Sequence, residues 1–200
     1  MSEIVYIYAD ESCLGIQFTD RDSPGGGAGL VEHWTGERWV RKDYWISEPA
    51  TTNNRMALSS AIEGLRRLRR PCHVIFTSDS QYLIKGRREW LPGWVRRGWK
   101  RKAGPVENEA LWKALIAAET ETRHAVDWRW VRGHAGNVKN EYANDIAIRA
   151  AKEQTSTPAL VESGFDAWIA AEREDHQRYM DFHEWAAPPE ERFNPVAPMK

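Results

Sequence analysis

The most informative stretch of the sequence is EIVYIYADE, from Glu3 to Glu11. Its apolar side chains alternate onto both faces of an extended chain, so the pattern predicts a strand inside a sheet that is covered on both sides. The strand ends in Asp10 and Glu11, and a carboxylate in that position is costly unless an opposite charge accompanies it. A metal ion would be such a partner. A turn that begins with Asp is the alternative, and the strand alone leaves both interpretations open.

Further strands and helices can be placed from apolar periodicity and from Gly and Pro. Ser23 to Gly27 is expected to be a Gly-rich turn. The predicted strands are Ala28–Trp34, Arg38–Ile46, His73–Asp79 and Val126–Val131, and the predicted helices are Asn54–Arg70, Gln81–Glu89, Glu107–Thr120, Asn140–Lys152 and a long acidic helix at Ala159–Ala186. The first three strands should form an antiparallel meander, and the strand ending at Asp79 should then run parallel to its neighbour.

The length of 200 residues suits one α/β domain with a tail. We expect a domain at 1–154 and an acidic helical extension at 155–200 with a Pro-rich end, which the domain should not need for folding. Cys13 and Cys72 give neither a disulfide framework nor a zinc spacing, which favours a reducing, cytoplasmic location. We expect no signal peptide, no membrane contact and a monomer.

The net charge of −1 conceals an uneven distribution. Lys85 to Lys102 contains eight Lys or Arg residues and one acidic residue, together with several tryptophans, whereas Thr155 to Lys200 contains four basic and nine acidic residues. The basic segment predicts an anionic partner at one place on the molecule. The acidic tail either packs on the domain or covers the basic segment as a partner-binding or autoinhibitory element, and we favour packing.

Asp10 and Asp79 both end predicted central strands, an arrangement that suggests a nuclease. A two-metal hydrolase needs carboxylates from different elements to hold ions about 4 Å apart. His134 lies on a Gly-flanked loop, where it would be suited to shuttle a proton. A surface histidine without a catalytic role is the alternative for His134 taken alone.

Five blocks of sequence resemble bacterial ribonuclease HI in order and spacing: YADESCLG, TTNNRMALSSAIEGL, TSDSQYLIKG, WLPGWVRRGWK and WVRGHAGNVKNEYANDIA. The resemblance spans about Ile4 to Lys152. It implies an α/β, ribonuclease H-like fold with a five-stranded mixed sheet, three antiparallel strands followed by two parallel ones, flanked by helices and followed here by the helical extension. It also implies endonucleolytic hydrolysis of the RNA strand of RNA–DNA hybrids, with Mg²⁺ held by four carboxylates. Mn²⁺ is the alternative ion, because oxygen ligands generally bind it more readily than Mg²⁺, which sheds its water reluctantly.

Position by position, the resemblance implies catalytic residues at Asp10, Asp79, His134 and Asn144, with Asp10 and Asp79 as metal ligands. Hybrid recognition would use shape and 2′-hydroxyl groups, and the basic residues would supply salt-dependent affinity. The substrate-binding residues that it implies are Cys13, Thr52, Asn53, Asn54, Gln81, Trp90, Trp94, Arg96, Arg97, Lys100 and Arg101.

The sequence departs from the family pattern at two of the four carboxylates. Ala57 stands at the second position and Asn144 at the fourth. We expect this loss to weaken cleavage, and the alternative is an inactive hybrid-binding module, whether natural or engineered. The candidate substitutes are Glu11, Asp145 and Glu141. Regular strand alternation would turn Glu11 away from the site, unless the strand frays at its end.

Overall fold

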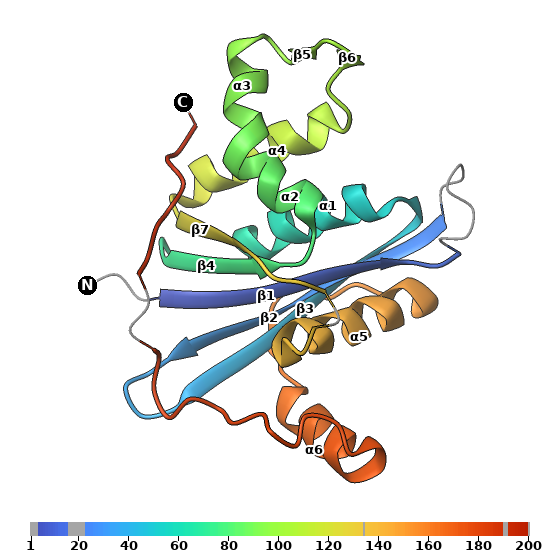
Figure 1. Cartoon of the computed structure of the whole chain (residues 1–200), viewed down its shortest axis with the longest axis vertical. Coiled ribbons are helices and arrows are strands. Elements are labelled where there is room, and N and C mark those ends of the chain that lie inside the picture. Colours follow the sequence, from blue (N-terminus) through green and yellow to red (C-terminus); the bar gives the residue numbers. More distant parts are fainter. Residues whose placement is uncertain (1–3, 16–22, 134, 190–191, 200) are drawn as a thin grey trace.

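The computed structural model describes residues 4–15, 23–133, 135–189 and 192–199. A mixed sheet crosses the centre of the molecule with strand order β7-β4-β1-β2-β3-β8 (Figure 1). Its strands are β1 (Ile4–Cys13), β2 (Ser23–Trp34), β3 (Trp39–Thr51), β4 (His73–Ser78), β7 (Ala125–Trp130) and β8 (Val161–Glu162). The pairs β1–β2 and β2–β3 are antiparallel, and β4 pairs parallel with both β1 and β7. The predicted meander and parallel strands are therefore confirmed.

The sheet has six strands, and the prediction of five is wrong. The additional strand, β8, is two residues long and comes from the tail. It pairs antiparallel with Lys42 and Asp43 of β3. Its brevity explains why no alternating pattern predicted it, because two residues contain no period to read.

The predicted Gly-rich turn is also wrong, since Ser23 to Gly27 forms the beginning of β2. A Cβ on Gly26 would lie 2.2 Å from the carbonyl oxygen of Ala147, and one on Gly27 would lie 2.8 Å from Cβ of Ser60. Helices therefore approach this part of the strand closely from both faces. Glycine is required here for close packing of helices on a strand, and not for a turn.

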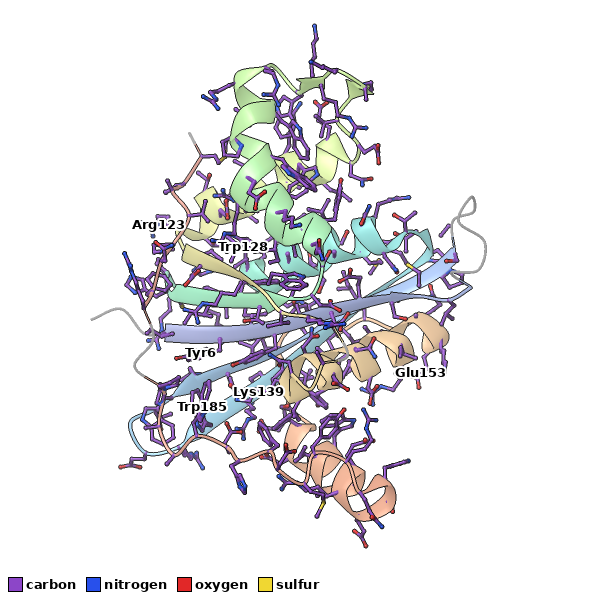
Figure 2. All side chains as sticks on the ribbon, in the orientation of Figure 1. Tyr6, Arg123, Trp128, Lys139, Glu153 and Trp185 are labelled. Atoms are coloured by element: carbon purple, nitrogen blue, oxygen red, sulfur yellow. The ribbon has the colours of Figure 1, made fainter. Side chains whose placement is uncertain are left out.

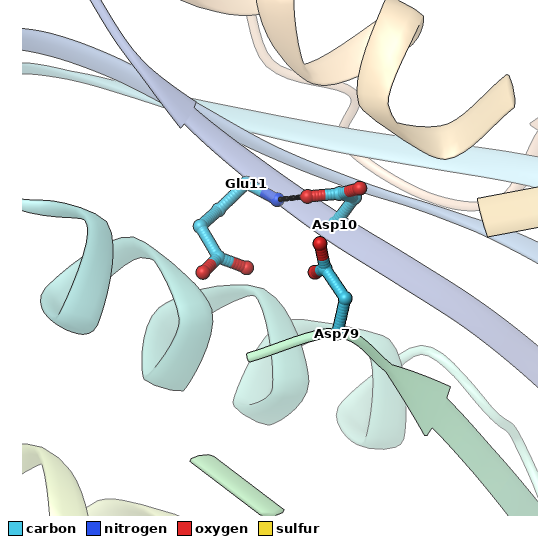
Figure 3. Close-up of side chains that lie close together, drawn as sticks. All are labelled: Asp10, Glu11 and Asp79. Carbon is cyan, nitrogen blue, oxygen red and sulfur yellow. Dashed lines mark hydrogen bonds between the residues drawn. The ribbon is translucent and has the colours of Figure 1, made fainter. Parts of the chain in front are cut away.

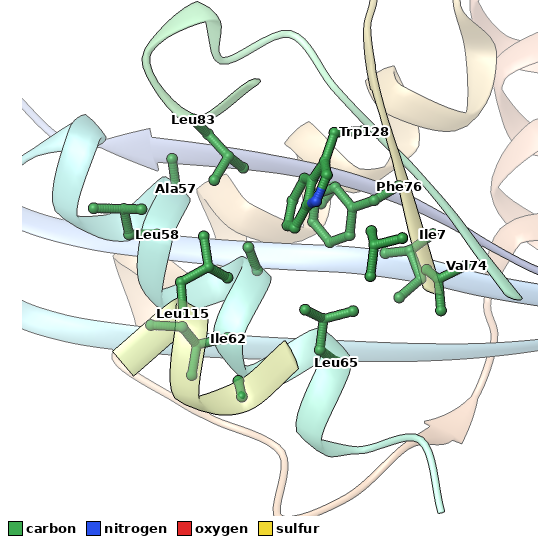
Figure 4. Packing of buried hydrophobic residues seen from close by; sticks show 14 of the residues in the cluster. Ile7, Ala57, Leu58, Ile62, Leu65, Val74, Phe76, Leu83, Leu115 and Trp128 are labelled. Carbon is green, nitrogen blue, oxygen red and sulfur yellow. The ribbon is translucent and has the colours of Figure 1, made fainter. Parts of the chain in front are cut away.

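Helices cover both faces of the sheet and create two cores. On one face, α1 (Asn53–Arg66) and α4 (Glu109–Thr122) pack on Ile7, Phe76 and Trp128 (Figure 4). On the other face, α5 (Val138–Glu153) packs on Tyr6 and Tyr8. The first strand is thus buried on both sides, as its sequence predicts.

A protrusion carries most of the basic segment at one end of the molecule (Figure 1). It consists of α2 (Gln81–Lys85), one π-helical turn (Gly86–Trp90), α3 (Leu91–Arg96) and a short hairpin of β5 (Lys100–Arg101) and β6 (Gly104–Pro105). The predicted helix over Gln81–Glu89 is therefore present, but its second half is a π-helical turn, and the helical chain continues through α3 to Arg96.

The tail does not form the predicted long helix. Its helix α6 spans only Phe165–His176, and Phe165 and Ile169 are buried in the second core. Helix α6 lies at the opposite end of the molecule from α3, so its acidic surface does not cover the protrusion (Figure 1). The last residues run along β7, where the Val196 N–H donates to the Val126 carbonyl at 3.0 Å. None of the described helices is long and apolar enough to cross a membrane.

Candidate active site

Three carboxylates gather where β1 and β4 approach the same edge of the sheet (Figure 3). Asp10 and Glu11 belong to β1, and Asp79 follows β4 directly. Because Ala9 is paired with Ser78, the next residues in the two strands, Asp10 and Asp79, are neighbours. One oxygen from each of the three carboxylates lies within 4.8 Å of the others. Asp10 is buried, whereas Glu11 and Asp79 are half-buried.

Asp10 and Glu11 reach this cluster from opposite faces of β1. Glu11 lies on the side of Ile7 and Ala9 and extends toward α1, while Asp10 lies on the side of Tyr8 (Figure 3). Strand alternation is therefore regular, as expected. The inference that alternation removes Glu11 from the site is wrong, because Asp79 lies at the end of the neighbouring strand, within reach of both faces.

The two positions where the family pattern is broken lie on helices at either face. Ala57 of α1 is only 2% exposed and belongs to the first core, so a methyl group fills that position. Asn144 of α5 is half-buried. Asn140, one turn before it, donates its Nδ2 hydrogen to the Ala9 carbonyl at 3.0 Å. Helix α5 is thereby fixed to β1 directly beside Asp10.

Burial and crowding of negative charge raise the pKa of Asp10 and of Glu11. Burial, and then the Asp79 carboxylate, raise the pKa of Asp10 to about 8, although the Glu11 backbone N–H donates to it at 2.7 Å. Burial and the charges of Asp10 and Asp79 hold the pKa of Glu11 well above its usual range. Keeping all three groups ionised is costly, and a bound cation would offset that cost.

The raised pKa of Asp10 predicts how the stability of the metal-free protein depends on pH. Because the folded state raises the pKa of Asp10 from 3.8 to about 8, the folded protein binds a proton that the unfolded chain has already lost between these values. The free energy of unfolding should therefore fall as the pH rises through that window, by at most about 1.4 kcal/mol per pH unit for each such group. Urea unfolding at several pH values measures the slope. Asp10→Asn should flatten it, and a slope that is unchanged in Asp10→Asn would contradict the assignment.

The loop after β7 packs against the third carboxylate. A Cβ on Gly133 would lie 2.2 Å from Oδ2 of Asp79, so only glycine permits the observed approach. The indole Nε1 of Trp130 donates to the Asp79 backbone carbonyl at 2.9 Å. His134, the predicted proton shuttle, lies outside the described residues. Reasoning from the sequence missed Gly133 as a site residue, and its position beside the histidine was the available signal.

The residues implied for hybrid binding differ in exposure. Thr52 caps α1 by accepting from the Arg55 N–H at 3.4 Å. Trp94 is buried between Trp90 and Trp112, with ring centroids 5.8 and 5.6 Å away, so it supports the protrusion from inside. The exposed members are Thr52, Asn54, Gln81, Trp90, Arg96, Arg97 and Lys100, the half-buried ones are Asn53 and Arg101, and Cys13 is buried together with Trp94.

Comparison with known proteins agrees with this fold. The family model for RNase H matches residues 2–152. Ribonuclease H of Pseudomonas entomophila is 47% identical over 155 residues, covering 76% of this chain and 97% of the relative. Ribonuclease HI of Neisseria meningitidis is 44% identical over 155 residues, covering 76% of this chain and 99% of the relative.

A solved structure extends the likeness to the tail. The crystal structure of LC9-RNase H1, described as a type 1 RNase H with the type 2 active-site motif, superposes with a TM-score of 0.88 at 43% identity. The match covers 100% of this chain and 95% of that one. The fold and the relatives define a ribonuclease H-type hydrolase. The chain belongs to the ribonuclease H family, and the resemblance that its sequence blocks indicate is confirmed.

Proposed function

We propose that this chain hydrolyses the RNA strand of RNA–DNA hybrids with divalent ions held by Asp10, Glu11 and Asp79. The observation that carries the proposal is the approach of these three carboxylates to within 4.8 Å of one another. The names of the relatives support the reaction class. The type 2 active-site motif of LC9-RNase H1, within a type 1 RNase H, supports a carboxylate pattern that differs from the usual one.

The cluster is suited to a hard divalent ion such as Mg²⁺ or Mn²⁺. Its ligands are carboxylate oxygens, which such ions prefer. Burial, and after it the charges of the neighbouring carboxylates, raise the pKa values of Asp10 and Glu11, so the protein alone does not favour ionisation of all three groups. When bound, such ions polarise the scissile phosphate and activate water.

In this proposal Glu11 supplies the charge that Ala57 cannot supply. Its side chain lies on the same face of the sheet as α1, which bears Ala57 and supplies no carboxylate there. Asn144 offers a neutral oxygen, so three of the four family charges are retained. We therefore expect binding of Mg²⁺ to depend more on the substrate phosphate than in a four-carboxylate site. His134 remains a prediction for proton transfer.

A cleavage assay on a labelled RNA–DNA hybrid, in Mg²⁺ and separately in Mn²⁺, tests the proposal. We expect cleavage of the RNA strand and none in Asp79→Asn, which keeps the shape of the side chain but removes its charge. Hybrid binding without cleavage in either ion would contradict the proposal and favour the inactive binding module. Duplex DNA as a competitor tests whether recognition depends on the 2′-hydroxyl groups of the RNA.

The protrusion predicts a salt-dependent contribution to hybrid binding. Arg96, Lys100 and Lys102 are exposed, whereas Arg101 is committed to an ion pair with Glu107. Replacing the three exposed residues by alanine should reduce the slope of log K against log salt by roughly two to three units, because each phosphate contact contributes nearly one. Fluorescence anisotropy across a salt series measures this slope. Arg101→Ala is the control with a smaller expected change, and an unchanged slope in the triple variant would contradict this surface.

A further inference from the structure

The segment Arg178–Trp185, here called the strap, crosses the beginning of α5 after α6 has ended. The Arg178 N–H closes α6 by donating to the Glu172 carbonyl at 3.1 Å. At the other end of the strap, the Trp185 carbonyl accepts from Nε1 of Trp39 in β3 at 2.8 Å. Figure 2 marks Trp185 and Lys139, whose Nζ lies 5.7 Å from the Trp185 ring. The strap is thus fixed to the domain at both ends.

Glu141, in the first turn of α5, connects the strap with the loop after β7. Its Oε2 accepts from the Tyr179 hydroxyl at 2.6 Å and from Nη2 of Arg178 at 3.0 Å. Its Oε1 accepts from the Gly136 N–H at 3.1 Å. A single carboxylate therefore joins two strap side chains to the backbone of the loop that approaches the active site.

A second contact fixes the same turn of α5. The ammonium group of Lys139 is buried, and it pairs with Glu184 of the strap at 3.0 Å and with the buried Glu32 of β2. Because a buried ammonium needs its partners, this contact holds the strap firmly against the helix. The beginning of α5 is therefore held by the strap on both sides of Asn140.

This turn of α5 is coupled to the carboxylate cluster in two ways. Asn140 donates to the carbonyl of Ala9, the residue before Asp10. The loop that Glu141 holds at Gly136 packs at Gly133 against Asp79.

We propose that Arg178 and Tyr179 are positioning residues for RNA hydrolysis, which act through Glu141 to orient the loop beside the metal ligands. The inference rests on the proposed function and gives two residues of the tail a part in positioning the active site. Arg178 balances the charge of Glu141, and the Tyr179 hydroxyl fixes its orientation. Without them, Glu141 would no longer hold Gly136 in one place, and the loop would sample several positions against Asp79.

The test uses the full-length protein with Arg178→Gln and Tyr179→Phe combined. At a temperature well below the unfolding midpoint of every variant, kcat on a labelled hybrid should fall about tenfold, because small misplacements of site groups are costly for catalysis. KM should stay within about twofold, since the substrate-binding surface on the protrusion is untouched. Glu162→Gln is the matched control, because it removes the exposed ion pair between Lys42 and the tail without touching Glu141.

Two further measurements separate positioning from a general structural role. In the Glu141→Gln background, the strap variants should cause almost no additional loss of kcat. The reason is that the Glu141 carboxylate, through which Arg178 and Tyr179 act, is already absent. Amide exchange at Gly136 should accelerate in the strap variants and not in Glu162→Gln. Undiminished kcat, or an equal loss in the Glu141→Gln background, would overturn the inference.

The two proposals fail in distinguishable ways. If the unaltered protein cleaves no hybrid in Mg²⁺ or Mn²⁺, the proposed function is wrong, and exchange at Gly136 still reports whether the strap holds the loop. If it cleaves and the strap variants match Glu162→Gln in kcat and in Gly136 exchange, the positioning role alone is wrong.

Discussion

Replacing Glu11 by glutamine should reduce Mg²⁺-dependent cleavage of an RNA–DNA hybrid by about a thousandfold. Glutamine keeps the length of the side chain and removes the charge that α1, with Ala57, does not supply. Loss of one metal ligand removes several kcal/mol of transition-state stabilisation, and about 1.4 kcal/mol corresponds to a factor of ten. Single-turnover cleavage with saturating enzyme measures the chemical step without the contribution of binding.

Asp145→Asn is the matched control for this loss. Asp145 follows Asn144 and is a candidate substitute ligand by sequence, but it is exposed and its Oδ2 accepts from Nε1 of Trp168 at 2.9 Å. Its substitution should leave cleavage within a few-fold of the unaltered protein. Normal cleavage in Glu11→Gln together with loss in Asp145→Asn would reverse the assignment of the third ligand.

Removing the tail should produce the largest loss of stability. A chain ending at Gln154 lacks Phe165 and Ile169, which are 1% and 8% exposed in the second core, and it also lacks β8. Losing a buried Phe costs about 3–5 kcal/mol and losing a buried Ile about 2–5 kcal/mol, and about 2–4 °C accompanies each kcal/mol in a chain of this size. We therefore expect the unfolding midpoint to fall by roughly 10–40 °C, contrary to the expectation that the domain does not need the tail.

Thermal unfolding followed by circular dichroism measures this effect. A chain ending at Pro189 is the informative control, because it keeps β8, α6 and the strap. It loses Phe193, which stacks on His73 with ring centroids 4.6 Å apart, and the Val196 contact with β7. Its midpoint should fall by much less. An unchanged midpoint for the chain ending at Gln154 would restore the view of the tail as a separate extension.

The sequence predicts the first half of the fold well because its signals there are local. The apolar faces of β1 and the acid at the end of β4 follow from alternation within single segments. The Gly-rich start of β2 could not be predicted in this way. Its glycines are required because helices from later in the chain pack closely on the strand, as α5 does through Ala147. Likewise β8 exists only through its partner strand β3.

The carboxylate cluster could be predicted only in part from single segments of the sequence. The sequence identifies Asp10, Asp79 and the loss at Ala57, and it offers Glu11 as a substitute. Alternation along β1 gives the correct face for Glu11 but says nothing about where Asp79 lies in the neighbouring strand. The contacts of Glu141 were equally hidden, because its partners Arg178 and Tyr179 follow a helix whose length the sequence did not predict.

Anomalous diffraction from crystals soaked in Mn²⁺ tests the central claim most directly, because it locates the ion without relying on activity. We predict a manganese peak in contact with carboxylate oxygens of Asp10, Glu11 and Asp79, at the separation of about 2.1 Å typical of small hard divalent ions. The same soak of Glu11→Gln should give a much weaker peak. A fully occupied ion bound by Asp10 and Asp79 without any oxygen of Glu11 would contradict the assignment of Glu11 as a metal ligand.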